Sequence, residues 1–420
     1  MKLVKFKKDT ERWLSSYQNF FTSKYTSQFS CIGSKCEDNC CQGDWGVFIS
    51  KEEYEGYQKL DSENATNLLQ YMEKNDNAIS NGAYATIQFN SAGRCSFLTE
   101  EKLCQIQLDH GLHTLCDTCK IYPRVIQKVQ HSYYETCHLS CPEVARLVLL
   151  ANTPFDWITS IDSNLKTTFV GSSDIDRNLN YVKKMHKHIT YFLTQKEYAL
   201  TQRIRLIGIF VNRFCHALQN NIGTNKAMKL AQKQINIDLK NKNENTFDLK
   251  ISLLLHVILK IENALQSHDV SPRFEECLQL FKEGMKIKQG ETVNQTDFLQ
   301  IYKHNYDAYY QPFFTKHEQM LENYCSYYFQ HQLFPYDGNI LARNFLIFNI
   351  EFSILKLILV GISASHIGLN EDIIIQLFQS YSKIFQHYPG YKIECINKLH
   401  DELLNYTTDY SRILNILISE

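Results

Sequence analysis

Hydrophobic and polar positions alternate with a helical period over most of the chain beyond about residue 150. In three segments an apolar residue recurs at every third or fourth position, which predicts amphipathic helices with one buried face each. The three faces are Ile204, Ile207, Val211, Phe214 and Leu218; Ile251, Leu254, Leu255, Ile258, Ile261 and Leu265; and Phe345, Phe348, Phe352, Leu355 and Leu359. We therefore expect residues 151–420 to form an α-helical domain.

The first 150 residues show a different pattern. Apolar residues alternate with others over 45–49 and, more weakly, over 83–89, which predicts short strands. The sequence Ser-Lys-Glu-Glu at 50–53 has the form of a capping box, so a helix should begin there, and Pro142 marks the start of another. The fold class expected is mainly α, with an N-terminal domain (1–150) that carries short strands. Gly171-Ser172-Ser173 is a candidate linker, and 241–245 is an expected loop.

One apolar stretch, Phe345–Ile362, is almost long enough to cross a membrane. Asn349, Ser353 and Lys356 share one stripe of it at helical spacing, which favours an amphipathic or buried helix over a membrane span. The basic N-terminal residues are not followed by an apolar run, so no secretory signal is recognised. The chain is expected to be cytoplasmic, with no membrane insertion.

Composition narrows the class of protein further. The chain has 420 residues, which is enough for two or three domains, and its 44% hydrophobic and 21% charged residues are ordinary for a globular protein. Its formal net charge of -1 provides no basic excess to hold a phosphate backbone, so no nucleic-acid partner is expected.

Cysteines are concentrated in the first third of the chain. Ten of the 14 lie before residue 142, at positions 31, 36, 40, 41, 95, 104, 116, 119, 137 and 141. Because cytosolic thiols stay reduced, such a cluster indicates metal ligands more than disulfides. Zinc and iron–sulfur clusters both bind four thiolates, and only Cys116-x-x-Cys119 has the CxxC form of a zinc ribbon. The spacing therefore favours a centre assembled from several loops, whose metal stays open.

Individual cysteines carry further expectations. The side chains of the neighbours Cys40 and Cys41 should point apart, and Cys141 should lie at a helix start that favours its thiolate. The four isolated cysteines should be small buried hydrophobic residues: Cys215, Cys277, Cys325 and Cys395. Nearby histidines could replace a thiolate, although packed or solvated histidines are commoner: His110, His113, His131 and His138.

Five motifs surround these cysteines: Cys31-Ile32-Gly33-Ser34-x-Cys36-Glu37-Asp38-x-Cys40-Cys41-x-Gly43-x-Trp45, Arg94-Cys95-x-Phe97-Leu98-x-Glu100, Leu103-Cys104-x-Ile106-Gln107, Thr118-Cys119-x-x-Tyr122-Pro123-Arg124 and Leu139-Ser140-Cys141-Pro142-Glu143-x-Ala145-Arg146-Leu147. Together they resemble the flagellin lysine-N-methylase family. The resemblance covers most of the chain, strongly up to residue 147. A shorter subset of these cysteines also resembles a wider group of iron- or zinc-chelating domains.

This resemblance implies an enzyme that transfers a methyl group from S-adenosylmethionine to lysine side chains of flagellin and carries a [4Fe-4S] cluster, with zinc as the alternative metal. The metal ligands it implies are Cys31, Cys36, Cys40, Cys41, Cys95, Cys104, Cys119 and Cys141. Cys116 and Cys137 rank lower, because they lie where the family is expected to vary.

No residue identifies the reaction centre. The chain has no G-x-G-x-x-G motif and no CxxxCxxC arrangement, so neither the cofactor pocket nor the catalytic residues can be assigned. A neutral amine needs no radical chemistry, which favours a polar displacement with a structural or regulatory cluster. We expect Arg124 and Arg146 to pair with structural acids, Trp45 to pack against the cluster, and the aromatic run 306–314 to be core. The alternative is a non-enzymatic metal-chelating, redox or interaction protein.

Overall fold

The structure is a computed structural model of the 420-residue chain. It describes residues 19–43, 45–60, 67–75, 81–129, 132–152, 156–159, 170–171, 179–233, 247–265, 271–288, 293–333, 341–407 and 410–418. The expected loop at 241–245 lies outside the described residues, as do Ser172 and Ser173 of the candidate linker and His131.

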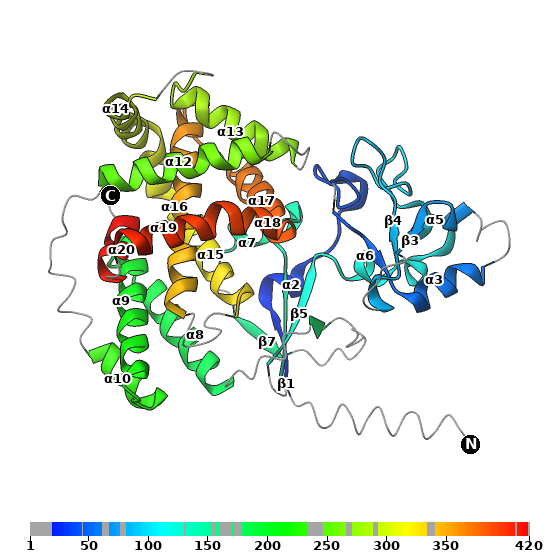
Figure 1. Cartoon of the computed structure of the whole chain (residues 1–420), viewed down its shortest axis with the longest axis horizontal. Helices are drawn as coiled ribbons and strands as arrows, with labels where there is room; N and C mark the ends of the chain where they lie inside the picture. Colours follow the sequence, from blue (N-terminus) through cyan, green and yellow to red (C-terminus); the bar gives the residue numbers. More distant parts are fainter. Residues whose placement is uncertain are drawn as a thin grey trace.

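Helices make up the larger part of the molecule, on the left in Figure 1. They are α8 (Leu179–Leu193), α9 (Leu200–Gln219), α10 (Thr224–Lys233), α12 (Phe247–Leu265), α13 (Pro272–Gly284), α14 (Gln295–Asn305), the π-helix η5 (Tyr306–Tyr310), α15 (Gln311–His331), α16 (Leu341–Ser365), α17 (Glu371–His387), α18 (Pro389–Tyr391), the π-helix η6 (Lys392–Asn397), α19 (Lys398–Tyr406) and α20 (Tyr410–Ile418). The mainly α fold expected from the sequence is confirmed, and the four isolated cysteines are buried within these helices.

Helix α16 forms the centre of this body. Most of its residues are buried, because α9, α13, α17 and α20 pack around it and aromatic rings of α15 contact it. Of its three stripe residues, Lys356 is half-buried, whereas Asn349 and Ser353 are buried and donate hydrogen bonds to the carbonyls of Phe345 (2.7 Å) and Leu417 (3.0 Å). By length and composition α16 could cross a membrane, but that stretch is the core of a folded body, as expected.

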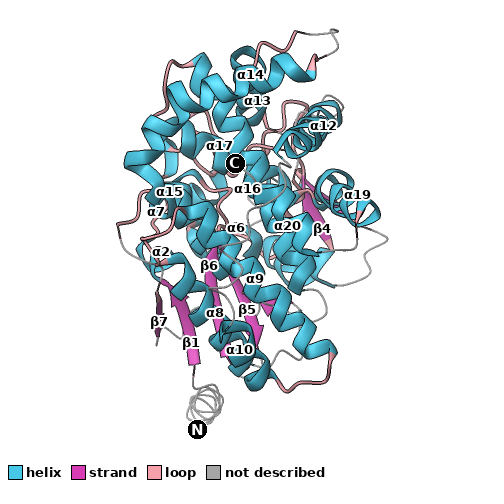
Figure 2. Ribbon diagram, turned by 90° about the vertical axis from the view of Figure 1, so that its left-hand side faces the viewer, coloured by secondary structure: helices cyan, strands magenta, loops and turns pink. Residues whose placement is uncertain are grey.

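A five-stranded sheet lies against the helices (Figure 2). Its strands are β1 (Asn19–Ser23), β5 (Arg124–Val129), β6 (Ser132–Cys137), β7 (Trp157–Thr159) and β8 (Val170–Gly171), in the order β7-β1-β6-β5-β8. Strand β6 is buried along its whole length, and the short helices α2 (Lys24–Gln28) and α7 (Pro142–Leu149) follow β1 and β6. The sheet takes strands from both sides of residue 150, where the domain boundary stays a prediction.

Residues 31–121 form a small second lobe, on the right in Figure 1, which we call the cysteine lobe. It contains the 3₁₀ turns η1 (Gly33–Lys35), η2 (Asn81–Ala83) and η3 (Leu112–Thr114), the strands β2 (Phe48–Ile49), β3 (Met72–Lys74) and β4 (Ala85–Ile87), and the helices α3 (Lys51–Gln58), α5 (Gln105–His110) and α6 (Asp117–Ile121). The lobe has a core of its own, which includes Ile49, Tyr57, Ala85 and Ile106.

The local predictions for this region are confirmed. The strand expected over 45–49 is present but shorter, as β2 over Phe48–Ile49, and α3 begins with the capping box at Ser50, whose hydroxyl accepts from the Glu53 amide (3.2 Å). The strand expected near 83–89 is β4, and α7 begins at Pro142. These elements are set by nearest-neighbour chemistry, which explains why a single sequence predicts them.

Helices α13 and α16 cross at two glycines. A Cβ atom added at Gly284 would lie 1.9 Å from the Gly361 carbonyl oxygen, a backbone atom that cannot rotate away. We predict that Gly284→Ala destabilises the fold by about 3 kcal/mol, because the crossing must open. Gly56→Ala in α3 is the matched control: nothing lies within 4 Å of its new Cβ, and it should stabilise by about 1 kcal/mol or less. Urea unfolding of both variants measures this, and equal stability would contradict the close crossing.

Candidate functional site

The loop Cys36–Cys41 is held in a tight turn by Asn39. The Asn39 side-chain oxygen accepts from the Cys41 amide (2.8 Å), and its side-chain nitrogen donates to the Lys102 carbonyl (2.9 Å). The Cys95 amide donates to the Cys41 carbonyl (2.9 Å). These bonds bring the turn, Cys95 and the loop before Cys104 into one small volume.

Three thiols of this region lie close together. Interaction of the Cys41 thiol with Cys40 and Cys95 lowers the pKa of Cys40 and of Cys95 and raises that of Cys41. The expectation that the side chains of Cys40 and Cys41 point apart is therefore wrong. Successive side chains point apart in an extended strand, whereas these two residues lie in the Asn39 turn.

A second pair of thiols lies nearby. The thiols of Cys116 and Cys119 interact with each other, which lowers the pKa of Cys116 and raises that of Cys119. Cys104 lies within electrostatic reach of Cys40 and Cys119. Six thiols are thus gathered, and we call them the thiol set: Cys40, Cys41, Cys95, Cys104, Cys116 and Cys119. Cys116, ranked lower from the sequence, belongs to it through its CxxC spacing.

The other cysteines are placed differently. The Cys36 thiol donates to the Asp38 carbonyl (3.3 Å), and burial raises its pKa to about 11. Cys31 is exposed, and its sulfur accepts from the Gly33 amide (3.5 Å). Cys141 caps α7 near Cys36, but burial raises its pKa to about 12. The expectation that the helix start favours the Cys141 thiolate is therefore wrong, because desolvation outweighs the two backbone amides. Burial raises the pKa of Cys137, inside β6, in the same way.

The thiol set has the donor chemistry of an iron or zinc site, since thiolates are the usual ligands of both. In the described part of the chain, however, no three His, Cys, Asp or Glu side chains are arranged to hold one metal ion. The structure therefore brings candidate ligands together without forming a finished coordination shell.

The cysteine lobe is joined to the helical body through Asp38. Its carboxylate accepts from Lys383 Nζ (2.6 Å) and from Gln379 Nε2 (2.7 Å), both on α17. Gln379 also donates to the Ser140 carbonyl (2.7 Å). Close by, Arg146 of α7 forms an ion pair with Glu37, so the pairing expected for this arginine is confirmed.

The pairing expected for Arg124 is confirmed as well, because it pairs with the buried acid Glu135 (3.6 Å). Trp45, expected to pack against the cluster, is half-buried. The Trp45 indole donates to the Cys40 carbonyl (2.9 Å), and its ring lies 4.6 Å from that of His387, edge to face. Trp45 thus bridges the thiol set and α17.

Three histidines form a group next to Trp45, which contacts one of them, His387. The His138 ring is 5.1 Å from that of His331 and 5.0 Å from that of His387. Burial lowers the pKa of His138 to about 4 and that of His387 to about 3, and it places that of His331 well below its ordinary value. Hydroxyls hold two rings in place: Ser140 Oγ at 2.7 Å from His387 Nε2, and Thr136 Oγ1 at 3.0 Å from His331 Nδ1. All three imidazoles are therefore neutral near pH 7.

A buried acid continues this polar region into α16. Glu351 is 3% exposed, and its Oε1 lies 3.0 Å from Lys392 Nζ, which is also within electrostatic reach of His331. Glu351 is the charged group that acts most strongly on the hydroxyls of three surrounding tyrosines: Tyr324, Tyr328 and Tyr381. We call Glu351 and these tyrosines the carboxylate–tyrosine cluster. Its only signal in the sequence is an acid inside the apolar run of α16.

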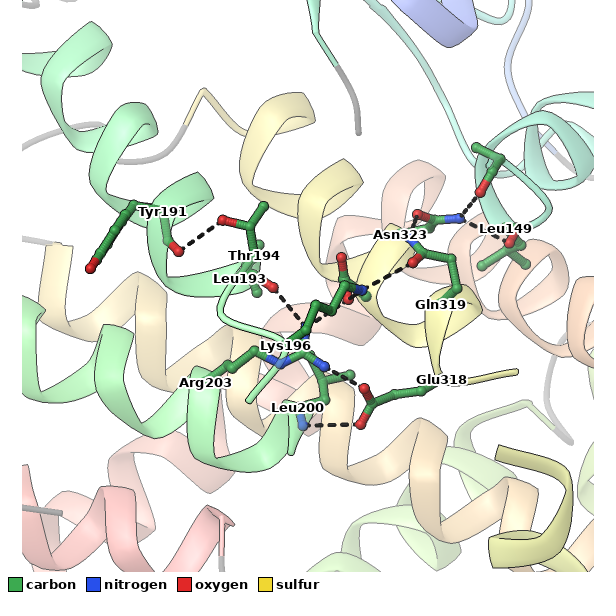
Figure 3. Close-up of polar contacts among 12 residues, drawn as sticks. Leu149, Tyr191, Leu193, Thr194, Lys196, Leu200, Arg203, Glu318, Gln319 and Asn323 are labelled. Carbon is green, nitrogen blue, oxygen red and sulfur yellow. Dashed lines mark hydrogen bonds and ion pairs between the residues drawn. The ribbon is translucent and has the colours of Figure 1, made fainter. Parts of the chain in front are cut away.

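A cavity of about 220 Å³ lies between β7, α8 and α15, lined by Trp157, Thr190, Glu322, Ser326 and Phe329. Its acid, Glu322, forms ion pairs with Lys196 and with Arg203, which is fully buried and lies 2.6 Å away. Arg203 also donates to the Leu193 carbonyl (2.7 Å) and pairs with Glu318 (Figure 3). This network ties α8, α9 and α15 together.

Comparisons with known proteins identify the family. The model of the FliB lysine N-methylase C-terminal domain matches residues 187–413, which include the carboxylate–tyrosine cluster. The chain is 33% identical over 133 residues to the "Flagellar biosynthetic protein FliU" of Salmonella muenchen, covering 30% of this chain and 73% of that protein. It is 29% identical to the "Lysine-N-methylase" of Salmonella typhimurium over 150 residues and to that of Salmonella choleraesuis over 159, covering 34% of this chain in each case.

The chain therefore belongs to the FliB lysine N-methylase family, as the cysteine motifs indicated. The matched segments span about a third (35%) of the length of the two Lysine-N-methylases. No solved structure matches.

The depressed histidine pKa values predict that stability falls with acidification. Unfolded histidines take up protons near pH 6.5 but the buried ones do not, so their contribution is complete above pH 6.5 and is lost toward pH 3–4. By pH 5, each of these histidines lowers the free energy of unfolding by up to about 2 kcal/mol. In urea unfolding from pH 7 to pH 5, His387→Gln should show a smaller loss than wild type. The exposed His366→Gln should match wild type, and identical slopes in all three would contradict a buried neutral His387.

Proposed function

We propose that the protein is a protein-lysine N-methyltransferase that moves a methyl group from S-adenosylmethionine to lysine side chains of flagellin. The observation that carries this proposal is the family match over 187–413, in a chain whose relatives include a flagellar biosynthetic protein. The carboxylate–tyrosine cluster and the three histidines lie in or against the matched segment. They supply the polar groups that an amine acceptor needs inside an otherwise apolar body.

The main task of the protein in this reaction is to align the lysine nitrogen with the methyl group. A lysine arrives as an ammonium, since its ordinary pKa is about 10.4, and must give up its proton to water before the nitrogen can attack. The new bond joins that nitrogen to the methyl carbon, and the electron pair of the broken carbon–sulfur bond stays on sulfur. Burial raises the pKa of Tyr324, Tyr328 and Tyr381, so these hydroxyls stay neutral and serve to orient an amine.

We propose further that the cysteines hold a [4Fe-4S] cluster, with zinc as the alternative metal. The residues that would hold it come from the thiol set, with Cys31, Cys36 and Cys141 as further ligands implied by the family resemblance. Displacement at a sulfonium transfers no electron, so the centre would act as a cross-link between the turn at 36–41 and the loops at 95–104 and 116–119. It would fix the position of Trp45 and Asp38 against α17.

The proposed setting is the cytoplasm. All 14 cysteines are free, which suits a reducing compartment, and the one helix apolar enough to cross a membrane is a buried core helix, consistent with a soluble protein. Flagellin is the proposed partner, and the similarity to a relative named as a flagellar biosynthetic protein supports this proposal.

Metal content tests the thiol set. After anaerobic purification we expect iron and sulfide with visible charge-transfer absorption in wild type, and at least a severalfold loss of both in Cys104→Ser, because one thiolate is removed from the set. Cys215→Ser is the matched control, since Cys215 is buried and isolated in α9, and it should retain the metal. A colourless protein that binds only zinc would reject the iron–sulfur assignment. Equal metal in both variants would reject this ligand set.

Methyl transfer tests the activity. Metal-loaded protein incubated with methyl-labelled S-adenosylmethionine and purified flagellin should place label on flagellin lysines. Flagellin whose lysines have been acetylated beforehand should stay unlabelled, because the acceptor amine is blocked. Flagellin that stays unlabelled beside a competent donor and an intact metal centre would refute the methyltransferase. A metal centre without methyl transfer would favour the alternative, a metal-chelating or redox protein.

A further inference from the structure

We propose that the carboxylate–tyrosine cluster is the binding site for the side chain of the acceptor lysine, and that Lys392 of the same chain occupies it in this structure. The inference deepens the proposed function, on which it rests. It assigns the acceptor site to Glu351, Tyr324, Tyr328 and Tyr381, and it assigns to Lys392 the role of an internal occupant that an incoming lysine must displace.

The first observation is the route that the Lys392 side chain takes. Its side chain is 29% exposed, yet its amine meets a carboxylate whose side chain is only 4% exposed. The aliphatic stem therefore runs from solvent to a buried acid, which is the path a lysine from another protein would follow. Lys392 begins the π-helix η6, and π-helical turns are frequent at functional sites.

The second observation is hydrogen-bonding capacity left unused. In the described part of the chain, Glu351 Oε2 and the Tyr381 hydroxyl have no hydrogen-bond partner, although both residues are buried. A buried polar atom without a partner costs about 1–3 kcal/mol. A structural ion pair between α16 and η6 would need only one acid and one base. The additional unpartnered acceptor and hydroxyl suit a ligand whose ammonium carries three donors.

The third observation is the aromatic surround. The Tyr324 ring lies 4.6 Å from that of Phe378, and the Tyr328 ring lies 4.9 Å from that of Phe348. These rings surround the cluster with apolar surface and exclude water from it, which weakens the competition of solvent for the amine.

The cavity between β7, α8 and α15 is a weaker candidate for the acceptor site. Its acid, Glu322, already binds two cations, Lys196 and the fully buried Arg203. Displacing Lys196 would leave Arg203 in place, so an incoming ammonium would meet a carboxylate that is still neutralised. At Glu351 the only described cation partner is Lys392 itself.

Chemical rescue with n-butylammonium, which has the shape and charge of a lysine side chain, tests the assignment without donor, flagellin or turnover. Lys392→Ala should lower Tm because it leaves Glu351 unpaired, and n-butylammonium should restore Tm in a concentration-dependent way. We expect at least tenfold tighter binding to this variant than to wild type, since wild type must first release Lys392. Should Lys392→Ala not fold alone, refolding with n-butylammonium should recover soluble protein, and failure to do so would count against the site.

Three controls make the outcome specific. Lys398→Ala removes an exposed lysine of the neighbouring helix and should show no rescue. The double variant Lys392→Ala/Glu351→Gln should lose the rescue, and n-butanol, which lacks the charge, should not rescue Lys392→Ala. Rescue by n-butanol, or rescue that survives Glu351→Gln, would overturn the site. Absence of rescue with flagellin methylation intact would overturn the site alone, whereas rescue without methylation would overturn the proposed function and leave Glu351 as an alkylammonium site without an acceptor role.

Discussion

The arrangement of the candidate site depends on the Asp38 carboxylate, which joins the cysteine lobe to α17 of the helical body. Asp38 lies within the cysteine turn, and its partner Lys383 lies on α17; their side chains are 11% and 7% exposed. Removing one member of so buried a pair costs about 3–5 kcal/mol, because the other charge is left without a partner. Gln379 shares the carboxylate and also binds the Ser140 carbonyl, so three separate segments meet at one residue.

The consequence is a continuous polar region between two lobes that fold around separate cores. The Asp38 contact places Trp45 against His387, and the histidines lead to His331, near Lys392 and Glu351. Trp45 and the three histidines therefore connect the thiol set to Glu351, the carboxylate that could bind an amine. In this arrangement a metal centre need not take part in the reaction, because stiffening the cysteine turn already determines how the lobe meets α17.

Local chemistry made much of the fold predictable from the sequence. The capping box at Ser50, the proline start of α7 and the apolar faces of the long helices depend on neighbouring residues, and each is found in the structure. The five-stranded sheet was not predicted, because β1 pairs with β6 across more than a hundred residues and no local pattern encodes that pairing. The thiolate expected at Cys141 failed for a related reason: its burial is decided by distant packing.

The candidate site also has a part that the sequence predicts and a part that depends on the fold. Cysteine spacing and family motifs indicated the members of the thiol set, whereas the turn that brings Cys40 and Cys41 together depends on Asn39 and its bond to Lys102. The histidines and Glu351 come from β6 and its C-terminal end, α15, α16 and α17, and only the folded chain brings them together. A lone acid in an apolar helix is weak evidence in a sequence, and it becomes informative once its unpartnered oxygen is seen among tyrosines.

The most direct test of the account is peptide mass spectrometry of flagellin produced in cells with and without this protein. The account predicts methylated lysines only when the protein is present, and fewer of them with Lys383→Met, because the cysteine lobe would no longer be held against α17. Flagellin lysines that are unmodified in the presence of folded, metal-loaded protein would contradict it.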